Sequence, residues 1–236
     1  MKGFIVFIPL IIFALNSAWE FSGSTSRQLG GELVNRVETE EKVIALTFDD
    51  GPTPGFTQRV LDILEAEDVR ATFFLVGESI EANPLEAKRI IDAGHEVGNH
   101  SYSHPRMVLI EYDFVAGELE RTDELIREAG FTGTIHFRPP FGRKLFSLPR
   151  YLGDHGITSI TWDVAPETWD DEVQPRAEVV EKVLQEARPG SIVLLHVMFP
   201  SRENTIAAVP EVIRGLRQQG YRFVTVSEML KYRQPG

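Results

Sequence analysis

Cysteine is absent from the 236 residues of this chain. The chain can therefore form no disulfide bond, bind no metal through a thiolate and use no thiol as a nucleophile. Basic residues are also scarce, because 24 lysines and arginines stand against 35 acidic residues, which gives a net charge of -11. A protein that binds nucleic acid usually presents a basic face to the phosphates, so no nucleic-acid partner is expected.

The N-terminus carries a short apolar run. Lys2 precedes the apolar residues 4–15, which are followed by Asn16, Ser17 and Ala18. This order is typical of a secretory signal peptide, residues 1–18, and the run is shorter than the roughly 20 residues of a membrane-spanning helix. Because asparagine is a poor residue three positions before a cut, an uncleaved anchor with residues 4–15 in a membrane is the alternative. Both interpretations predict a protein that is secreted, periplasmic or attached to the cell envelope.

The remainder of the chain is expected to form a linker and one domain. Residues 19–42 are polar, with a flexible spacer at 22–26 and a short edge strand at Leu33, Val34 and Val37. From residue 43 to 233, apolar runs rich in valine, isoleucine and phenylalanine alternate with amphipathic stretches of helical period. The runs predict strands at residues 43–48, 71–77, 96–99, 134–138, 158–162, 192–196 and 222–226. The amphipathic stretches predict helices at residues 57–67, 84–93, 111–129, 148–155, 176–187 and 206–219.

This alternation indicates an α/β fold. A strand followed by a helix and another strand favours parallel strands joined by right-handed crossovers. Runs that are apolar at consecutive positions suit strands that are covered on both faces. We therefore predict a distorted or incomplete (β/α) barrel with about seven parallel strands.

Chemically unusual side chains follow several of the predicted strands. Active sites of parallel α/β folds lie beyond the carboxyl ends of the strands. Alone, an Asp-Asp-Gly-Pro sequence is more typical of a solvent-exposed turn. Here polar residues of this kind occur at the ends of five predicted strands, which favours a functional site instead. The residues are Asp49 and Asp50 after the first strand, His100 and His104 after the third, Arg138 at the fourth, Asp163 after the fifth and His196 at the sixth.

Two of the histidines have the spacing of metal ligands. His100 and His104 are four residues apart, which in a helical turn would place both imidazoles on one side. Two histidines and one carboxylate make a three-ligand site for a divalent metal, with positions left for water and substrate. Histidines that cap a loop in solvent are the alternative, which the nearby acidic pair disfavours. The remaining candidates, His95, His136 and His155, are expected to be structural.

Four segments resemble the ordered motifs of the polysaccharide deacetylase family, also called carbohydrate esterase family four. The resemblance extends from Val43 to Leu230 and implies a distorted (β/α) barrel. It also implies a metal-dependent hydrolase of carbon–nitrogen bonds, which removes acetyl groups from N-acetylated amino-sugar polymers such as peptidoglycan or chitin. The segments are residues 47–52 (TFDDGP), 100–104 (HSYSH), 138–142 (RPPFG) and 194–196 (LLH).

The resemblance further implies a role for each motif residue. Asp49 would be the general base, Arg138 would orient it and His196 would be the general acid. The backbone N–H of Phe141 would help to hold the oxyanion, at a position where the family often has tyrosine. The metal would be zinc, with cobalt, manganese or nickel as alternatives, and water held there would be the nucleophile. Its ligands would be Asp50, His100 and His104, while Pro139 and Trp169 would line the substrate site.

One motif departs from the family's pattern. The family usually has Asp-x-x-Asp-Trp, in which the second aspartate pairs with the acid histidine, whereas residues 165–169 read Ala-Pro-Glu-Thr-Trp. A carboxylate partner raises the pKa of a histidine and keeps it protonated, which threonine does not do by charge. We expect Asp163, Glu167 or Asp170 to replace it at His196. Asp163 is favoured because it lies at the end of a predicted strand.

Two other functions remain open from the sequence. An O-deacetylase of acetylated xylan or another polysaccharide would use the same site, so only substrate assays separate it from an N-deacetylase. A non-catalytic descendant that binds carbohydrate is the alternative from a different class, and the altered fourth motif is its support. In each case the expected partner is a carbohydrate polymer.

Overall fold

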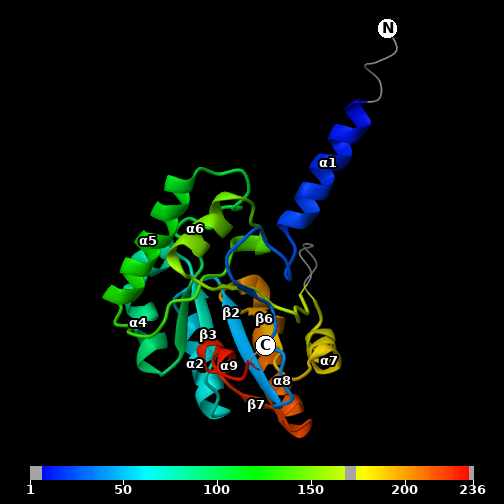
Figure 1. Ribbon diagram of the computed structural model, residues 1–236. Helices are drawn as coiled ribbons and strands as arrows, with labels where there is room; N and C mark the ends of the chain where they lie inside the picture. The colour runs from blue at the N-terminus through cyan, green and yellow to red at the C-terminus, as the bar shows by residue number, and fades with distance from the viewer. Residues whose placement is uncertain (1–6, 168–173, 234–236) are drawn as a thin grey trace.

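The computed structural model describes residues 7–167 and 174–233 (Figure 1). The central strand is β2 (Val43–Asp49), which pairs with β3 (Thr72–Leu75) and with β6 (Ile192–His196). β3 in turn pairs with β4 (Glu96–Asn99). All of these pairs are parallel, and every residue of the four strands is buried. Burial on both faces explains the consecutive apolar residues of β2, β3 and β6. In β4 the buried polar side chains are hydrogen-bonded, Glu96 to Thr72 and Asn99 to the Leu119 carbonyl oxygen.

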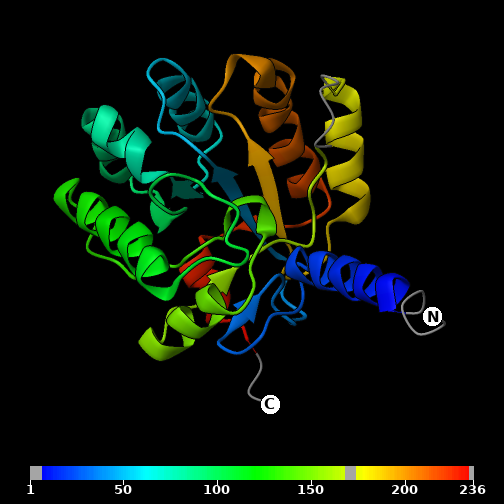
Figure 2. The ribbon, with the colours of Figure 1, turned by 90° about the horizontal axis from the view of Figure 1, so that it is seen from above.

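Beyond β4 the sheet continues through single bridges. Phe137 bridges β4 and β5 (Ser159–Ile160), and β5 pairs with β1 (Leu33–Val34). A further bridge joins Val164 to Val193 of β6. The strands thus curve round with an incomplete ladder, and the helices surround them when the molecule is viewed from above (Figure 2). The prediction of a distorted (β/α) barrel is confirmed.

Several predicted strands are shorter in the structure, as at residues 158–162, where β5 covers only Ser159–Ile160. At residues 134–138 only Phe137 forms bridges, because Pro139 and Pro140 follow at once and have no N–H to continue a ladder. At residues 222–226 the strand β7 (Arg222–Phe223) ends early. The chain then enters the short helix α9 (Val226–Leu230), which begins at a capping box between Thr225 and Glu228.

Helices cover the outside of the barrel close to their predicted positions. They bury an apolar face and expose a polar one, as α2 does with Val60, Leu61 and Leu64. The short α3 (Gly77–Ala82) was not predicted. The predicted helices correspond to α2 (Phe56–Ala66), α4 (Pro84–Asp92), α5 (Tyr112–Glu128), α6 (Ser147–His155), α7 (Arg176–Glu186) and α8 (Glu203–Gln218).

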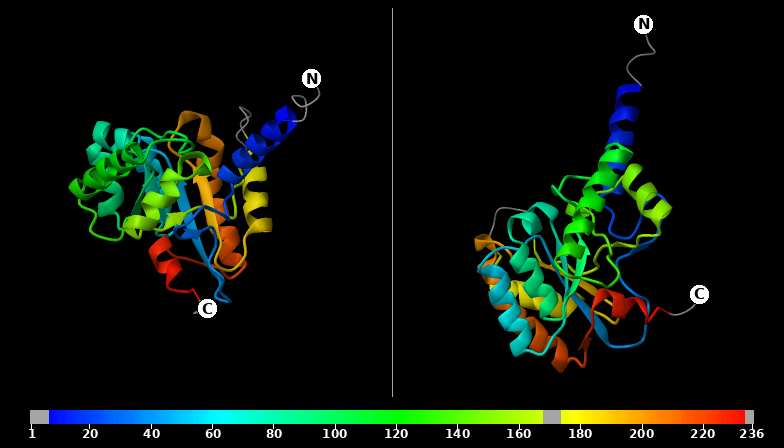
Figure 3. Two further views of the ribbon diagram at one scale, coloured as in Figure 1. Left: turned by 45° about the horizontal axis from the view of Figure 1, so that its top comes forward. Right: turned by 90° about the vertical axis from the view of Figure 1, so that its left-hand side faces the viewer.

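The N-terminal helix α1 (Phe7–Ser22) projects away from the barrel (Figures 1 and 3). Its apolar side chains, such as Ile11 and Phe13, are exposed. Within the described part of the chain, none of the helices is long and apolar enough to cross a membrane. The segment 22–26, for which we expect a flexible spacer, is bound to the barrel through Ser22 and Ser24. Lys144 donates its backbone N–H to the Ser22 carbonyl oxygen and its ammonium group to that of Ser24.

Candidate active site

The two adjacent carboxylates lie where β2 turns. Asp49 is the last residue of β2 and is only 2% exposed, while Asp50 and Gly51 both have positive φ, 70° and 72°. Successive side chains of a strand normally point to opposite faces, but this turn ends the alternation. Both carboxylates therefore approach the same imidazole, since His100 Nε2 lies 3.6 Å from Asp49 Oδ2 and 3.8 Å from Asp50 Oδ1. A Cβ at Gly51 would lie 2.7 Å from the Met198 side chain, so glycine is required there.

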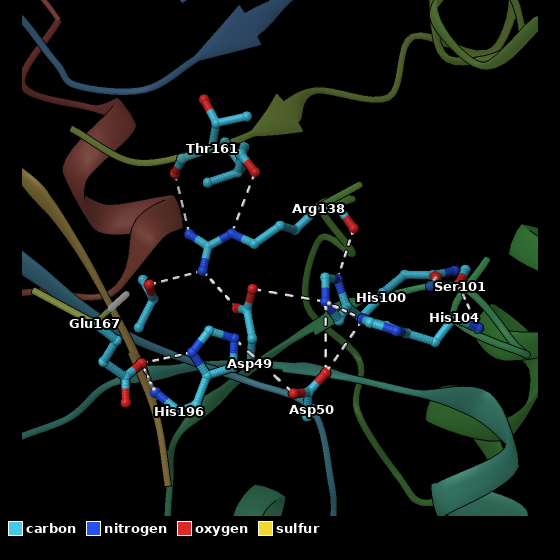
Figure 4. Close-up of polar contacts among 12 residues, drawn as sticks. Asp49, Asp50, His100, Ser101, His104, Arg138, Thr161, Glu167 and His196 are labelled. Atoms are coloured by element: carbon cyan, nitrogen blue, oxygen red, sulfur yellow. Dashed lines mark hydrogen bonds and ion pairs between the residues drawn. The ribbon is translucent and has the colours of Figure 1, made fainter. Parts of the chain in front are cut away.

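Arg138 holds one oxygen of Asp49. Its guanidinium is fully buried, and Nη1 donates to Asp49 Oδ1 at 2.6 Å and to Thr47 Oγ1 at 2.8 Å. The backbone oxygens of Ile160 and Thr161 accept from Nε and Nη2 at 3.3 and 3.1 Å. These hydrogen bonds give each nitrogen of the buried Arg138 guanidinium a protein partner, which offsets the cost of burying its charge. The other oxygen of Asp49 is left facing His100 (Figure 4).

His100 and His104 converge on Asp50. Their Nε2 atoms are 3.2 Å apart, and His104 Nε2 lies 3.3 Å from Asp50 Oδ1. His100 Nδ1 lies 2.7 Å from the backbone oxygen of Arg138. Because a carbonyl oxygen only accepts, Nδ1 carries the proton and the lone pair of Nε2 faces the carboxylates.

The two histidines do not share a helical turn, which corrects the expectation from their spacing. They lie on a loop after β4 in which Ser101 and His104 have positive φ, 66° and 55°. The His104 N–H donates to Ser101 Oγ at 3.1 Å, which bends the loop back on itself. Residues other than glycine adopt positive φ only at an energetic cost, so contacts with the surrounding structure must hold the loop in this conformation.

The donor set fits a divalent cation. Asp50, His100 and His104 each offer one ligand atom, and these atoms lie within 4.8 Å of one another. Burial lowers the pKa of His100 and lowers the pKa of His104 to about 4, so both imidazoles are neutral near pH 7. Burial raises the pKa of Asp50, whereas the positive charge of a bound cation would lower this pKa and so favour the ionised carboxylate. Two neutral nitrogens and one carboxylate oxygen suit a transition metal such as zinc.

His196 lies on the other side of the carboxylates and is paired with Glu167. Its Nδ1 and its backbone nitrogen lie 2.6 and 2.9 Å from Glu167 Oε2, while Thr205 Oγ1 donates to Glu167 Oε1 at 2.7 Å. His196 Nε2 lies 3.9 Å from Asp50 Oδ2. Burial alone would lower the pKa of His196, but the hydrogen bond and charge of Glu167, together with the charges of Asp49 and Asp50, outweigh it and raise that pKa.

The preference for Asp163 as the partner of His196 is wrong. Asp163 accepts hydrogen bonds from Ser191 Oγ and from the Ile192 N–H, both at 2.9 Å, at the beginning of β6. Glu167, the second of the three candidates, lies beside the end of that strand, where His196 is. The third candidate, Asp170, and the predicted substrate contact Trp169 lie outside the described residues.

Phe141 and Pro139 lie in the turn after Arg138. Phe141 has positive φ, 56°, and its ring centre is 4.7 Å from that of His104. The guanidinium of Arg106 lies 4.3 Å from the centre of the Phe141 ring. The Pro139 carbonyl oxygen accepts the N–H of Gly142 at 2.9 Å, which closes the turn. The turn thus places Phe141 beside the candidate metal site.

Comparison with known proteins decides the family. Residues 36–160, more than half of the chain, match the model of the family described as polysaccharide deacetylase. The chain belongs to the polysaccharide deacetylase family. This confirms the predicted family and the predicted class, a hydrolase of carbon–nitrogen bonds other than peptide bonds. The matched region contains Asp49, Asp50, His100, His104 and Arg138, and it ends before Glu167 and His196.

Individual relatives extend the likeness over most of the chain. A peptidoglycan-N-acetylglucosamine deacetylase of Bacillus cereus is 35% identical over 211 residues, 86% of this chain and 95% of that protein. The crystal structure of a peptidoglycan N-acetylglucosamine deacetylase is 31% identical with a TM-score of 0.78, and covers 83% of this chain and 91% of its own. A wild-type pseudoenzyme of the same family from Bacillus anthracis is 30% identical with a TM-score of 0.78, over 88% and 72% of the two chains.

Some residues that support the candidate active site do not stand out in the sequence. Thr205 binds Glu167, and Glu118 binds the loop that carries His104. Both lie on amphipathic helices, where an ordinary polar residue gives no signal of its own. The pairing of Glu167 with His196 joins residues 29 positions apart, so no local spacing shows it.

Proposed function

We propose that this deacetylase removes the acetyl group from N-acetylated amino sugars of peptidoglycan by hydrolysing the amide bond. One observation carries the proposal: an Arg138-bound carboxylate and a Glu167-bound imidazole flank a cation-binding donor set (Figure 4). Such a site has a base and an acid on two sides of one substrate position. The relatives named as peptidoglycan deacetylases support the substrate.

Asp50, His100 and His104 would hold a divalent cation, with zinc as the first candidate. Once bound, the cation would supply a Lewis acid that polarises the acetyl carbonyl and lowers the pKa of water. The backbone N–H of Phe141 would share the charge that develops on the carbonyl oxygen. Pro139 and the turn after it would keep that N–H beside His104.

The remaining residues would move protons. Asp49 would take a proton from the attacking water with Oδ2, because Arg138 occupies Oδ1. The water oxygen bonds to the acetyl carbon, and His196 would then protonate the sugar nitrogen from Nε2 as the carbon–nitrogen bond breaks. Acetate and a free amine leave. Glu167 keeps a proton on His196 Nδ1 and so leaves Nε2 aimed at the substrate.

Replacing Glu167 by glutamine should move the alkaline limb of the pH–rate profile to lower pH. A raised pKa of His196 keeps the general acid protonated to higher pH, so loss of the Glu167 charge lowers that pKa and removes activity sooner as pH rises. Because general acids contribute about 10²–10⁴-fold to rate, activity above the limb should fall by about tenfold or more. Acetate release between pH 5 and 10 measures both effects.

Asp163→Asn is the matched control for Glu167→Gln, since Asp163 binds the beginning of β6 and not His196. Its alkaline limb should coincide with that of the wild type. A limb that stays in place in Glu167→Gln, or moves in Asp163→Asn, would contradict the role given to Glu167. The melting temperature of each variant shows whether the fold is kept.

An acetate-release screen tests the proposed function. Peptidoglycan, chitooligosaccharides and acetylxylan are each incubated with the protein and zinc, cobalt, manganese or nickel, with and without a chelator. We expect release from peptidoglycan that the chelator abolishes. Release from acetylxylan alone would establish an O-deacetylase, and metal binding without release from any polymer would establish a non-catalytic binding protein. The non-catalytic alternative was supported by the missing aspartate of the fourth motif. Glu167 supplies a carboxylate to His196 in its place, which favours a catalytic protein.

We infer that the protein works in the cell envelope, where peptidoglycan lies. Cleavage after Ala18 would preserve the contacts of Ser22 and Ser24 with Lys144, and retention of residues 4–15 would add an apolar anchor. The barrel contacts are therefore the same in both forms. N-terminal sequencing of protein from membrane and extracellular fractions distinguishes them, and we expect a chain that begins at Trp19 outside the membrane.

A further inference from the structure

The loop between the two histidine ligands is held from two sides. Its conformation is costly, because Ser101 and His104 both have positive φ. Asp50 and His100 are placed by the strands they follow, and His100 is also fixed through the Arg138 carbonyl oxygen. His104 lies at the far end of the loop. Its position against the other ligands therefore depends on what binds the loop.

One side of the loop is held by Glu118 of α5. This carboxylate is only 7% exposed, and Oε2 accepts the N–H of Tyr102 at 3.0 Å and that of Ser103 at 2.8 Å. Oε1 accepts the hydroxyl of Ser103 at 2.8 Å. Glu118 therefore satisfies two successive backbone donors and one side-chain donor between the ligands. Charge-assisted hydrogen bonds of this kind are stronger than bonds between neutral groups.

The opposite side is held by the beginning of α3 and by Asn99. The N–H groups of Gly77 and Glu78 donate to the carbonyl oxygens of Ser101 and Tyr102 at 2.9 and 3.0 Å. Asn99 Oδ1 accepts the Ser101 N–H at 2.8 Å. A Cβ at Gly77 would lie 2.9 Å from Tyr102 Cα, so this contact is close as well as hydrogen-bonded. Backbone groups on one face and a buried carboxylate on the other thus fix the peptide units of the loop.

We propose that Glu118 is a positioning residue that holds His104 against Asp50 and His100 and thereby sets the affinity of the site for its cation. The inference rests on the proposed function, because it assumes that these three residues bind a divalent metal. Glu118 touches neither the ligands nor the substrate position, and it acts through the backbone of Tyr102 and Ser103. Partners that orient metal ligands typically change affinity by about 10- to 100-fold when they are removed.

Glu118→Gln tests the inference with little change of shape. The amide has no charge and one acceptor oxygen in place of two, so the charge-assisted hydrogen bonds to the N–H groups of Tyr102 and Ser103 become weaker bonds between neutral groups. The dissociation constant for Zn²⁺, measured by competition with a chelating dye, should rise about 10- to 100-fold. The visible absorption spectrum of the Co²⁺-loaded protein should change as well, since it reports the arrangement of the ligands. Ser103→Ala removes a single hydrogen bond and should give a smaller rise.

Glu128→Gln is the matched control, because Glu128 lies on the same helix and is exposed. Its Zn²⁺ affinity and Co²⁺ spectrum should equal those of the wild type. If Glu118→Gln lowers the melting temperature of the metal-free protein but leaves affinity and spectrum unchanged, the residue is only structural and the inference is overturned. If Glu118→Gln does not fold, an unchanged affinity in Ser103→Ala overturns it equally. Failure of the wild type to bind Zn²⁺ would instead refute the metal site of the proposed function.

Discussion

Asp49→Asn should abolish deacetylation while the protein still binds zinc. Asp49 is not one of the three clustered ligand residues, and its free Oδ2 is the proposed acceptor of the water proton. An asparagine amide cannot accept that proton, so kcat should fall by about 10²–10⁴-fold, the usual contribution of a general base. Acetate release gives the rate, and metal analysis of the purified variant gives the zinc content. Zinc content should stay at the wild-type level.

The same substitution should also lower stability. Asp49 is the buried carboxylate that pairs with Arg138, and removing one partner of a buried ion pair typically costs about 3–5 kcal/mol. The asparagine oxygen can still accept from Arg138, so the loss should lie at or below the lower end of that range. Urea unfolding measures it. Turnover that survives in a folded, zinc-loaded Asp49→Asn protein would refute the assignment of the base.

His104→Ala should lose both zinc and activity. The imidazole supplies one of the three donor atoms of the cluster, and its loss leaves one nitrogen and one carboxylate oxygen. Affinity should therefore fall by more than the roughly 10- to 100-fold expected when only a partner of a ligand is removed. Asp50→Asn should behave in the same way. Removal of zinc from the wild type by a chelator should produce an equal loss of activity.

Two controls distinguish the loss of a metal ligand in His104→Ala from damage to the fold. His155 is exposed and stacks on Tyr151 away from the site, so His155→Ala should keep zinc and activity at wild-type levels. Added zinc should restore a chelator-treated wild type but not His104→Ala. Full activity of His104→Ala at a stoichiometric zinc concentration would show that His104 is not a ligand.

The strands buried on both faces were the most predictable part of the fold. β4 and β6 have the predicted bounds, and in β6 every residue before His196 is apolar. β7 was predicted too long, since the capping box at Thr225 and Glu228 starts a helix where valines suggest a strand. That local signal is present in the sequence, whereas the single bridges at Phe137 depend on where the neighbouring strands lie.

The site was predictable to the extent that topology decides it. Parallel strands end at one edge of a sheet, so the side chains after β2, β4 and β6 had to meet. The direction of a side chain beyond its strand does not follow from topology. Asp163 and Glu167 both follow β5, and the path of the chain sends the first to the beginning of β6 and the second to its end. The loop at His104 was likewise assigned a helical turn because spacing alone carries no backbone angles.

Arg138 has a consequence for how the molecule moves. Its guanidinium binds Asp49 and its carbonyl oxygen binds His100, so a displacement of this one residue carries both partners with it. Arg138 therefore links the proposed base to one of the proposed metal ligands through a single residue. His196 follows a different support, Glu167 and Thr205 of α8. Asp49 and His196 are nevertheless Cα partners in the parallel pairing of β2 with β6, so the sheet fixes the spacing of their backbones while separate side-chain partners orient the two groups.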